Sequence, residues 1–159
     1  MVKKSNKKII VAVSGGFDPL HSGHVRMMEE AKKLGDKLVV ILNNDNWLIK
    51  KKGHAFMNQK EREEIIKALR VVDEVVVTAH PKNSKDMSVC LELREIRPHI
   101  FVNGGDRKPD GDPVPEVIVC GELGINMAYN IGHGGKVQSS SWLLENYLNR
   151  VKNNEKSKK

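Results

Sequence analysis

Apolar residues along the chain fall into two alternating patterns. Short, continuous and mostly aliphatic runs lie at residues 8–13, 37–42, 74–79, 99–105 and 125–130. Runs of this length without a polar face are typical of strands buried on both sides. Between them lie segments whose apolar residues recur every three or four positions, as Val25, Met28, Ala31 and Leu34 do, and this spacing predicts helices.

Signals at the ends of these segments set the helix boundaries. Gly35 is expected to end a first helix over 22–34, and Asn58 with Glu61 resembles a capping box ahead of a helix over 61–70. Further helices are predicted over 85–96, about 115–122 and about 140–149. Three segments are predicted to be loops: polar and irregular 43–57, the Pro- and Gly-rich stretch 106–115, and the Gly- and Ser-rich stretch 131–141.

Strands that alternate with helices predict an α/β fold with a single doubly wound, five-stranded parallel sheet, Rossmann-like, with helices on both faces. The loops at 14–24, 43–57, 103–115 and 131–141 all follow strands, so they meet at one edge of the sheet. Ligands of such sheets bind outside the carboxyl ends of the strands, where the strand order reverses. These loops are therefore the predicted site.

Composition and charge narrow the class of protein. The chain of 159 residues has a net charge of +7, of which the tails 1–8 and 150–159 contribute +4 each, leaving −1 for a domain at 9–149. Lysine-rich polar tails are usually solvated ends, so nucleic acid is an unlikely partner. Without a signal peptide or an apolar run of about 20 residues, we expect a soluble, cytoplasmic protein without membrane contact. Cys90 and Cys120 form neither a disulfide framework nor a zinc site.

The candidate chemistry lies directly after the first predicted strand. Gly15 and Gly16 allow backbone amides to approach an anion, and the helix that follows adds a partial positive charge at its start. His21 and His24, separated by Ser22-Gly23, lie where that helix begins, so both rings can face the same ligand. Imidazoles donate hydrogen bonds and can become cationic, which suits phosphoryl chemistry. The pattern is neither a P-loop nor a dinucleotide-binding glycine motif.

His21-Ser22-Gly23-His24, after Ser14-Gly15-Gly16-Phe17-Asp18-Pro19, matches the H-x-G-H signature of cytidylyltransferase-like nucleotidyltransferases, which the chain resembles from about residue 8 to 149. The resemblance implies that a phosphate-bearing acceptor attacks the α-phosphorus of a nucleoside triphosphate and releases pyrophosphate. It also implies Mg²⁺ bound with the nucleotide, no metal ligands from protein side chains and, because relatives are commonly dimeric, a possible homodimer.

The resemblance also implies roles for individual residues. His21, His24 and Lys52 are the catalytic candidates. The candidates for binding nucleotide or phosphate are Ser14, Gly15, Gly16, Phe17, Lys50, Lys51, Arg70, Ser139, Ser140 and Ser141. Which of Lys50 to Lys52 engages the triphosphate is open. Weaker candidates for contact with the nucleoside or the acceptor are Asn43, Asp45, Arg62, Gly104, Asp106 and Lys136.

Two stretches bear on the substrates. Lys136 stands where cytidylyltransferases carry an arginine before their Ser/Thr cluster, so its equivalence is in doubt. Residues 103–109 and 42–45 look more like the Gly-Gly-Asp-x-Lys-Pro and Asn-x-Asp stretches of heptose-phosphate adenylyltransferases. This resemblance favours a phosphorylated sugar, polyol or alcohol as acceptor, and it leaves CTP and ATP open.

Two alternatives remain. The H-x-G-H motif and the Lys-Val-Gln-Ser-Ser-Ser stretch are also similar to signatures of class I aminoacyl-tRNA synthetases, although 159 residues leave no room for domains that read tRNA. The other is a nucleotide-binding or nucleic-acid-associated protein without catalysis that uses its basic tails. Such a protein would keep its binding after loss of both histidines, with a steep salt dependence.

Overall fold

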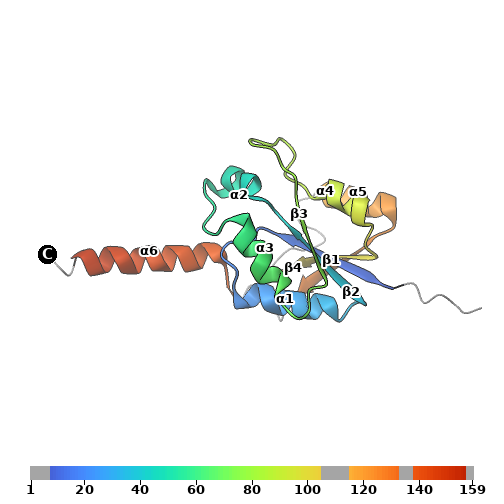
Figure 1. The fold of residues 1–159 in the computed structure, drawn as a ribbon, viewed down its shortest axis with the longest axis horizontal. Coiled ribbons are helices and arrows are strands. Elements are labelled where there is room, and N and C mark those ends of the chain that lie inside the picture. Colours follow the sequence, from blue (N-terminus) through green and yellow to red (C-terminus); the bar gives the residue numbers. More distant parts are fainter. Residues whose placement is uncertain (1–7, 105–114, 133–137, 157–159) are drawn as a thin grey trace, which may run out of the picture.

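The computed structural model describes residues 8–104, 115–132 and 138–156. All strands belong to one parallel sheet in the order β3-β2-β1-β4-β5. The strands are β1 (Ile10–Gly15), β2 (Lys37–Leu42), β3 (Glu74–Val77), β4 (Ile100–Gly104) and β5 (Asn126–Ile131). The helices are α1 (Ser22–Lys32), α2 (Asp45–Lys52), α3 (Gln59–Lys67), α4 (Cys90–Ile96), α5 (Pro115–Leu123) and α6 (Ser140–Lys156). The predicted α/β fold with a five-stranded parallel sheet is confirmed (Figure 1).

Helices cover both faces of the sheet, because each central strand is apolar on both sides. Val11 and Val13 of β1 pack in one cluster with α1 and α3. Ala12, on the opposite face of the same strand, packs in a second cluster with α4 and α5. Every one of these β1 side chains is fully buried. The continuous apolar run that the sequence shows is therefore the consequence of two cores sharing one strand.

The strand order places a reversal next to β1. The chain moves outward from β1 through β2 to β3, then returns to β4 on the other side of β1 and ends at β5. The loops that follow β1 and β4 therefore diverge at the carboxyl edge of the sheet, the usual position of a ligand cleft in such folds.

The prediction of a long loop over 43–57 is wrong, because α2 occupies its centre. The Asn44 side chain caps this helix by accepting a hydrogen bond from the Trp47 amide at 3.0 Å. Gly53 ends it with a φ of 83°. Within α2 Leu48 is the buried residue, so the helix shows no amphipathic stripe to reveal it in the sequence.

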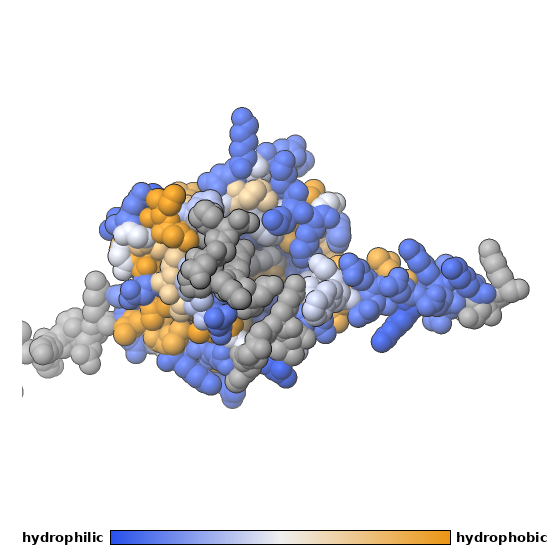
Figure 2. Space-filling model, turned by 180° about the vertical axis from the view of Figure 1, so that it is seen from behind, coloured by the Kyte–Doolittle hydropathy of each residue, from blue (hydrophilic) through white to orange (hydrophobic). Residues whose placement is uncertain are grey.

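Other helix boundaries also differ from the prediction, and α3 spans Gln59–Lys67 rather than 61–70. Helix α4 begins at Cys90 rather than near 85. Helix α6 continues to Lys156, past the boundary at 149 where the basic tail was expected to start. It extends away from the sheet, and its visible face is largely hydrophilic (Figures 1 and 2). Adding residues to an existing helix costs little, which explains how polar residues continue it.

No helix in the described part of the chain combines the length and the apolar character that crossing a membrane requires. The predicted stretch 106–115 and most of the loop 131–141 lie outside the described residues, apart from Pro115, Ile131, Gly132 and 138–141.

Candidate active site

A cleft of about 360 Å³ opens at the carboxyl edge of the sheet. Its floor is the end of β1 and the turn after it, with Ser14, Gly15, Gly16 and Phe17 in the lining. We call the wall formed by α1, the end of β5 and the start of α6 the histidine side, which contains His21, Gly23, His24, Met27, Ile131, Gly132, Gln138, Ser139, Ser140 and Ser141. We call the opposite wall the amide side, which contains Asn43, Trp47, Met87, Val89, Asn103 and Glu116.

The two histidines cap α1 and fix each other. The Gly23 amide donates to His21 Nδ1 at 3.1 Å, and the His21 amide donates to His24 Nδ1 at 3.3 Å. The rings stack with centroids 3.6 Å apart and an interplanar angle of 23°. Because each Nδ1 accepts a backbone hydrogen bond, a neutral ring carries its proton on Nε2. The cap therefore leaves one Nε2–H donor on each ring for a ligand.

Burial keeps both rings neutral. It lowers the pKa of His24 to about 3, with further contributions from His21 and Lys52. The pKa of His21 is also lowered, first by burial and then by Lys52. At neutral pH the pair consequently acts as two hydrogen-bond donors rather than two cations, until a bound anion favours protonation.

Among the three consecutive lysines, Lys52 lines the cleft. Its Nζ donates to the Asp18 carbonyl oxygen at 3.3 Å. Burial lowers its pKa, an effect that Asp18 opposes and Arg62 reinforces. All three lysines are exposed, but Lys50 and Lys51 lie outside the cleft lining, so the structure does not bring them to the site. As the last residue of α2, Lys52 alone of the three is directed back toward the turn after β1.

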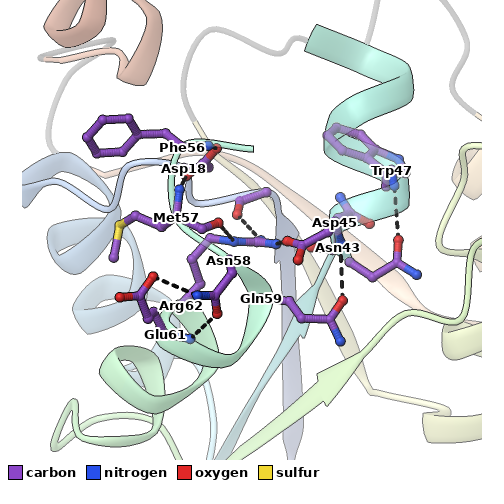
Figure 3. Close-up of polar contacts among 12 residues, drawn as sticks. Asp18, Asn43, Asp45, Trp47, Phe56, Met57, Asn58, Gln59, Glu61 and Arg62 are labelled. Carbon is purple, nitrogen blue, oxygen red and sulfur yellow. Dashed lines mark hydrogen bonds and ion pairs between the residues drawn. The ribbon is translucent and has the colours of Figure 1, made fainter. Parts of the chain in front are cut away.

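Arg62 lies beneath the cleft and does not line it, in contrast to the predicted contact with substrate. Its side chain is fully buried. It donates to the carbonyl oxygens of Gly16 at 2.6 Å, Asn43 at 2.8 Å and Met57 at 3.0 Å, and to Asp45 Oδ1 at 2.7 Å (Figure 3). Asp45 is therefore the ion-pair partner of Arg62 and not a cleft residue. This hub joins the turn after β1 to the end of β2, α2 and the loop before α3.

Asp18 also binds the loop between α2 and α3. Its buried carboxylate accepts hydrogen bonds from the amides of Phe56 and Met57, both at 2.7 Å (Figure 3). Since the loop follows α2 directly, Asp18 and Arg62 together hold the end of α2, and with it Lys52, over the turn after β1.

Arg70 is exposed and also lies outside the cleft lining. Helix α3 runs antiparallel to the strands, so its first turn is at the cleft edge and its end is at the opposite edge, where β3 begins. Arg70 follows the end of α3 and is consequently far along the sheet from the histidines, although it was a candidate for binding nucleotide or phosphate.

Packing explains two of the cleft glycines. A Cβ at Gly16 would lie 2.8 Å from Leu48 Cδ2, so the Leu48 side chain of α2 would have to shift. A Cβ at Gly104 would clash with the Met27 sulfur, so the Met27 side chain of α1 would have to shift. Both glycines line the cleft, and both leave room for these side chains.

The predicted serines meet the histidine side at the start of α6. Ser139, Ser140 and Ser141 all line the cleft. Ser140 is buried, and its hydroxyl donates to the Pro19 carbonyl oxygen at 2.9 Å, which ties α6 to the segment before α1. Ser139 and Ser141 are better placed to meet a ligand. Asp106 and Lys136 lie outside the described residues.

Except for Asn43, the residues of the amide side were not selected by the sequence analysis. Trp47 Nε1 donates to the Met87 carbonyl oxygen at 2.8 Å, which fixes the indole as part of this wall. Glu116 Oε1 accepts from the Val89 amide at 3.1 Å and joins the starts of α4 and α5. Asn103 is the fourth residue of β4, and the available signals were its position near the end of a predicted strand and its place at the start of the stretch 103–109.

The described residues contain no group of three His, Cys, Asp or Glu side chains placed to hold a metal ion. Glu116 is the carboxylate among the described lining residues.

Comparisons with known proteins agree with this geometry. A family model described as cytidylyltransferase-like matches residues 12–117. An FAD synthase of Pyrococcus horikoshii is 38% identical over 124 residues, which is 77% of this chain and 79% of that protein. The bifunctional protein HldE of Desulfatibacillum aliphaticivorans is 37% identical over 111 residues, or 69% of this chain but 21% of that protein. A crystal structure titled lipopolysaccharide core biosynthesis protein, from Thermoplasma volcanium, has a TM-score of 0.64 and 26% identity, and the match covers 80% of this chain and 100% of that chain.

Proposed function

The chain belongs to the cytidylyltransferase-like family of nucleotidyltransferases, and from this premise we propose that it transfers AMP from MgATP to a phosphorylated, hydroxyl-rich acceptor. The observation that carries the proposal is the capped, stacked pair of His21 and His24 in one cleft with Lys52. Two neutral N–H donors and one ammonium group suit a triphosphate whose α-phosphorus gains negative charge during attack.

In this reaction an oxygen of the acceptor phosphate attacks the α-phosphorus of ATP in line with the leaving group. The new bond is a phosphoanhydride, the bond to the α,β-bridging oxygen breaks, and pyrophosphate leaves with Mg²⁺. Backbone amides at 14–17 and the Nε2–H groups of both histidines bind the phosphate oxygens. Lys52 neutralises the charge that accumulates on the leaving group, and Ser139 and Ser141 bind its far end. Direct displacement needs no covalent intermediate on the protein.

We propose FMN as the acceptor to test first. FAD is the product of joining AMP to FMN, and the FAD synthases match this chain over most of both lengths. The phosphate of FMN is carried by a ribityl chain, which is a polyol phosphate of the class that the sequence favoured. The indole of Trp47 adds a flat apolar surface to the cleft wall, as a flavin ring requires.

A phosphorylated sugar is the second candidate. It is favoured by Asn103-Gly104 and the residues after them, which resemble heptose-phosphate adenylyltransferases, and by the matches to HldE proteins. Both candidates are adenylyl transfers, so they differ in the acceptor and not in the chemistry at the α-phosphorus.

The test is pyrophosphate release with Mg²⁺, for each of the four nucleoside triphosphates, crossed with FMN, sugar 1-phosphates and glycerol phosphate. We expect release that needs both ATP and a polyol or sugar phosphate, and chromatography identifies FAD or the ADP-sugar. His24→Ala is the matched negative control, and His54→Ala, at an exposed position outside the cleft lining, is the positive control. Release that needs CTP would correct the nucleotide. Nucleotide binding without turnover, unchanged in His24→Ala, would favour the non-catalytic alternative.

Two further expectations accompany this proposal. We place the protein in the cytoplasm, where ATP and phosphorylated metabolites are available. We also keep the homodimer as a proposal, because Trp142, Tyr147 and Leu148 of the projecting α6 are exposed large side chains. Sedimentation of the wild type and of Tyr147→Lys tests it, since a dimer formed through α6 should dissociate in the variant.

A further inference from the structure

Two buried carboxamides in the amide side of the cleft have polar atoms without partners. Asn43 and Asn103 are each 4% exposed. Within the described residues, neither Asn43 Oδ1 nor Asn103 Nδ2 has a hydrogen-bond partner. Both residues line the cleft. Buried side-chain polar atoms nearly always have a partner in the functional state, so these two atoms indicate a ligand or water that the cleft takes up.

Their positions relative to the sheet define where that ligand lies. Val13 of β1 is paired with Val102 of β4, so Asn103 lies beside Ser14. On the other side of β1, the backbone N–H of Asn43 donates to the Gly15 carbonyl oxygen at 2.9 Å. Side chains alternate between the two faces of the sheet along β2 and β4. Asn43 and Asn103 therefore lie on the same face as Ile41 and Phe101, which is the face covered by α4 and α5. The two carboxamides thus flank the turn after β1, across the cleft from the histidines.

The spacing suits a ligand with several hydroxyl groups. Asn43 and Asn103 are two strands apart, which places their backbones about 10 Å from each other. A polyol chain or a sugar ring is long enough to present one hydroxyl to each side chain. A hydroxyl group also donates and accepts, so it satisfies the oxygen of Asn43 and the nitrogen of Asn103 alike.

The charge of the amide side points to the same class of ligand. Glu116 is its ionisable member among the described lining residues, and it is 9% exposed. A buried carboxylate repels phosphate and accepts hydrogen bonds from hydroxyls. The amide side therefore suits the uncharged, hydroxyl-bearing part of a substrate, while the histidine side suits its phosphates.

We propose that Asn43 and Asn103, with Glu116 beside them, bind the hydroxyl groups of the acceptor and so determine its specificity. The proposal rests on the adenylyl transfer proposed above and deepens it, because it names the part of the acceptor that these residues read. Ribityl hydroxyls of FMN and ring hydroxyls of a sugar phosphate share this chemistry, and the experiment below distinguishes them.

The experiment replaces each carboxamide by an apolar side chain of similar size, Asn43→Leu and Asn103→Leu. Asn126→Leu, at an exposed position outside the cleft lining, is the matched control. Steady-state rates give KM for the acceptor and for ATP separately, and thermal unfolding gives the midpoint. FMN and a sugar 1-phosphate are run in parallel, each beside an analogue that lacks hydroxyls.

We expect each cleft variant to raise KM for the acceptor about tenfold and to change KM for ATP less than about twofold. The unfolding midpoint should stay unchanged or rise, because an unpartnered buried polar atom has been removed. The effect should shrink with the analogue that lacks hydroxyls. If the rise in KM depends on the hydroxyl groups for only one of the two acceptors, FMN or the sugar phosphate, that acceptor is the one that Asn43 and Asn103 bind.

Three results would overturn the proposal. A lower unfolding midpoint with both KM values unchanged would make the carboxamides structural. A rise in KM for ATP alone would assign them to the ribose of the nucleotide. If the wild type turns over no acceptor, the proposed reaction fails, and direct binding of FMN and of the sugar phosphate decides the inference by itself. Binding that is absent, or equal in the wild type and Asn43→Leu, then refutes it.

Discussion

The two sides of the cleft are built in different ways. The imidazoles of the histidine side depend on a short local segment, in which one turn and the first residues of α1 place both rings and cap the helix with them, while the end of β5 and the start of α6 complete the wall. The amide side gathers residues from β2, α2, the segment before α4, β4 and α5. A local segment carries its chemistry in its sequence, whereas a wall made from five separate segments acquires its chemistry when the sheet forms.

The first prediction tests the histidine side, where we expect the largest effect. His24→Ala should lower kcat/KM by about 10³-fold or more, because it removes a donor to the reacting phosphate. His21→Asn should lower it similarly while the cap on α1 is retained, since Asn is a good N-cap residue. Steady-state rates and unfolding midpoints check both variants. If the His24→Ala variant stays active, the histidine side does not bind the reacting phosphate as proposed.

The second prediction tests the frame that holds the two sides together. Arg62→Met should lower the free energy of unfolding by roughly 3 kcal/mol, because three carbonyl oxygens and Asp45 lose a buried charged partner. Arg70→Met, at the exposed end of the α3 segment, should stay within about 0.5 kcal/mol of the wild type. Urea unfolding measures both, and equal values for the two variants would contradict the description of Arg62 as a hub.

The third prediction separates the three lysines. Lys52→Met should reduce kcat/KM about 100-fold, because its ammonium group lies in the cleft, while Lys50→Met and Lys51→Met should change it less than about threefold. The three variants remove the same charge from one helix, so they control for net charge. Equal losses would mean that the triphosphate is attracted by the charge of α2 as a whole.

The smallest expected effect concerns pH. The pKa of His24 in the folded chain, about 3, lies below its ordinary value of 6.5. Between about pH 3 and pH 6.5 the unfolded chain therefore binds a proton at His24 that the folded chain does not bind. The free energy of unfolding consequently falls as the pH is lowered through this range. His24→Asn should show a shallower fall between about pH 7 and about pH 4.5 than the wild type. A slope in His24→Asn equal to that of the wild type would refute the assignment.

The difference between the sides also explains what the sequence could predict. The glycine turn, His21 with His24 and the Ser139–Ser141 run all line one cleft, and the sequence pointed to them because each lies within a few positions of a strand end or a helix start. The fold followed from the alternation of aliphatic runs and helical spacing.

The remaining residues needed the structure. Arg62 and Arg70 look alike in the sequence, but one is buried beneath the cleft and the other lies toward the opposite edge of the sheet. Their roles depend on how α3 crosses the sheet and on the polar groups that meet it. Met87 and Glu116 carry no motif, and they reach the cleft through the packing of α4 and α5 on β1 and β4. Helix α2 was missed because its cap residues, and not an apolar stripe, define it.

Transfer of a nucleotidyl group to a phosphorylated acceptor can be followed through the phosphates of ATP. ATP is labelled in parallel at the α- and γ-positions and incubated with FMN or a sugar phosphate. We expect the α-label to enter the acceptor product, the γ-label to leave in pyrophosphate, and both transfers to disappear in His24→Ala. Transfer of the γ-label to the acceptor, or an α-label that remains on free nucleotide with every acceptor, would contradict the proposed reaction.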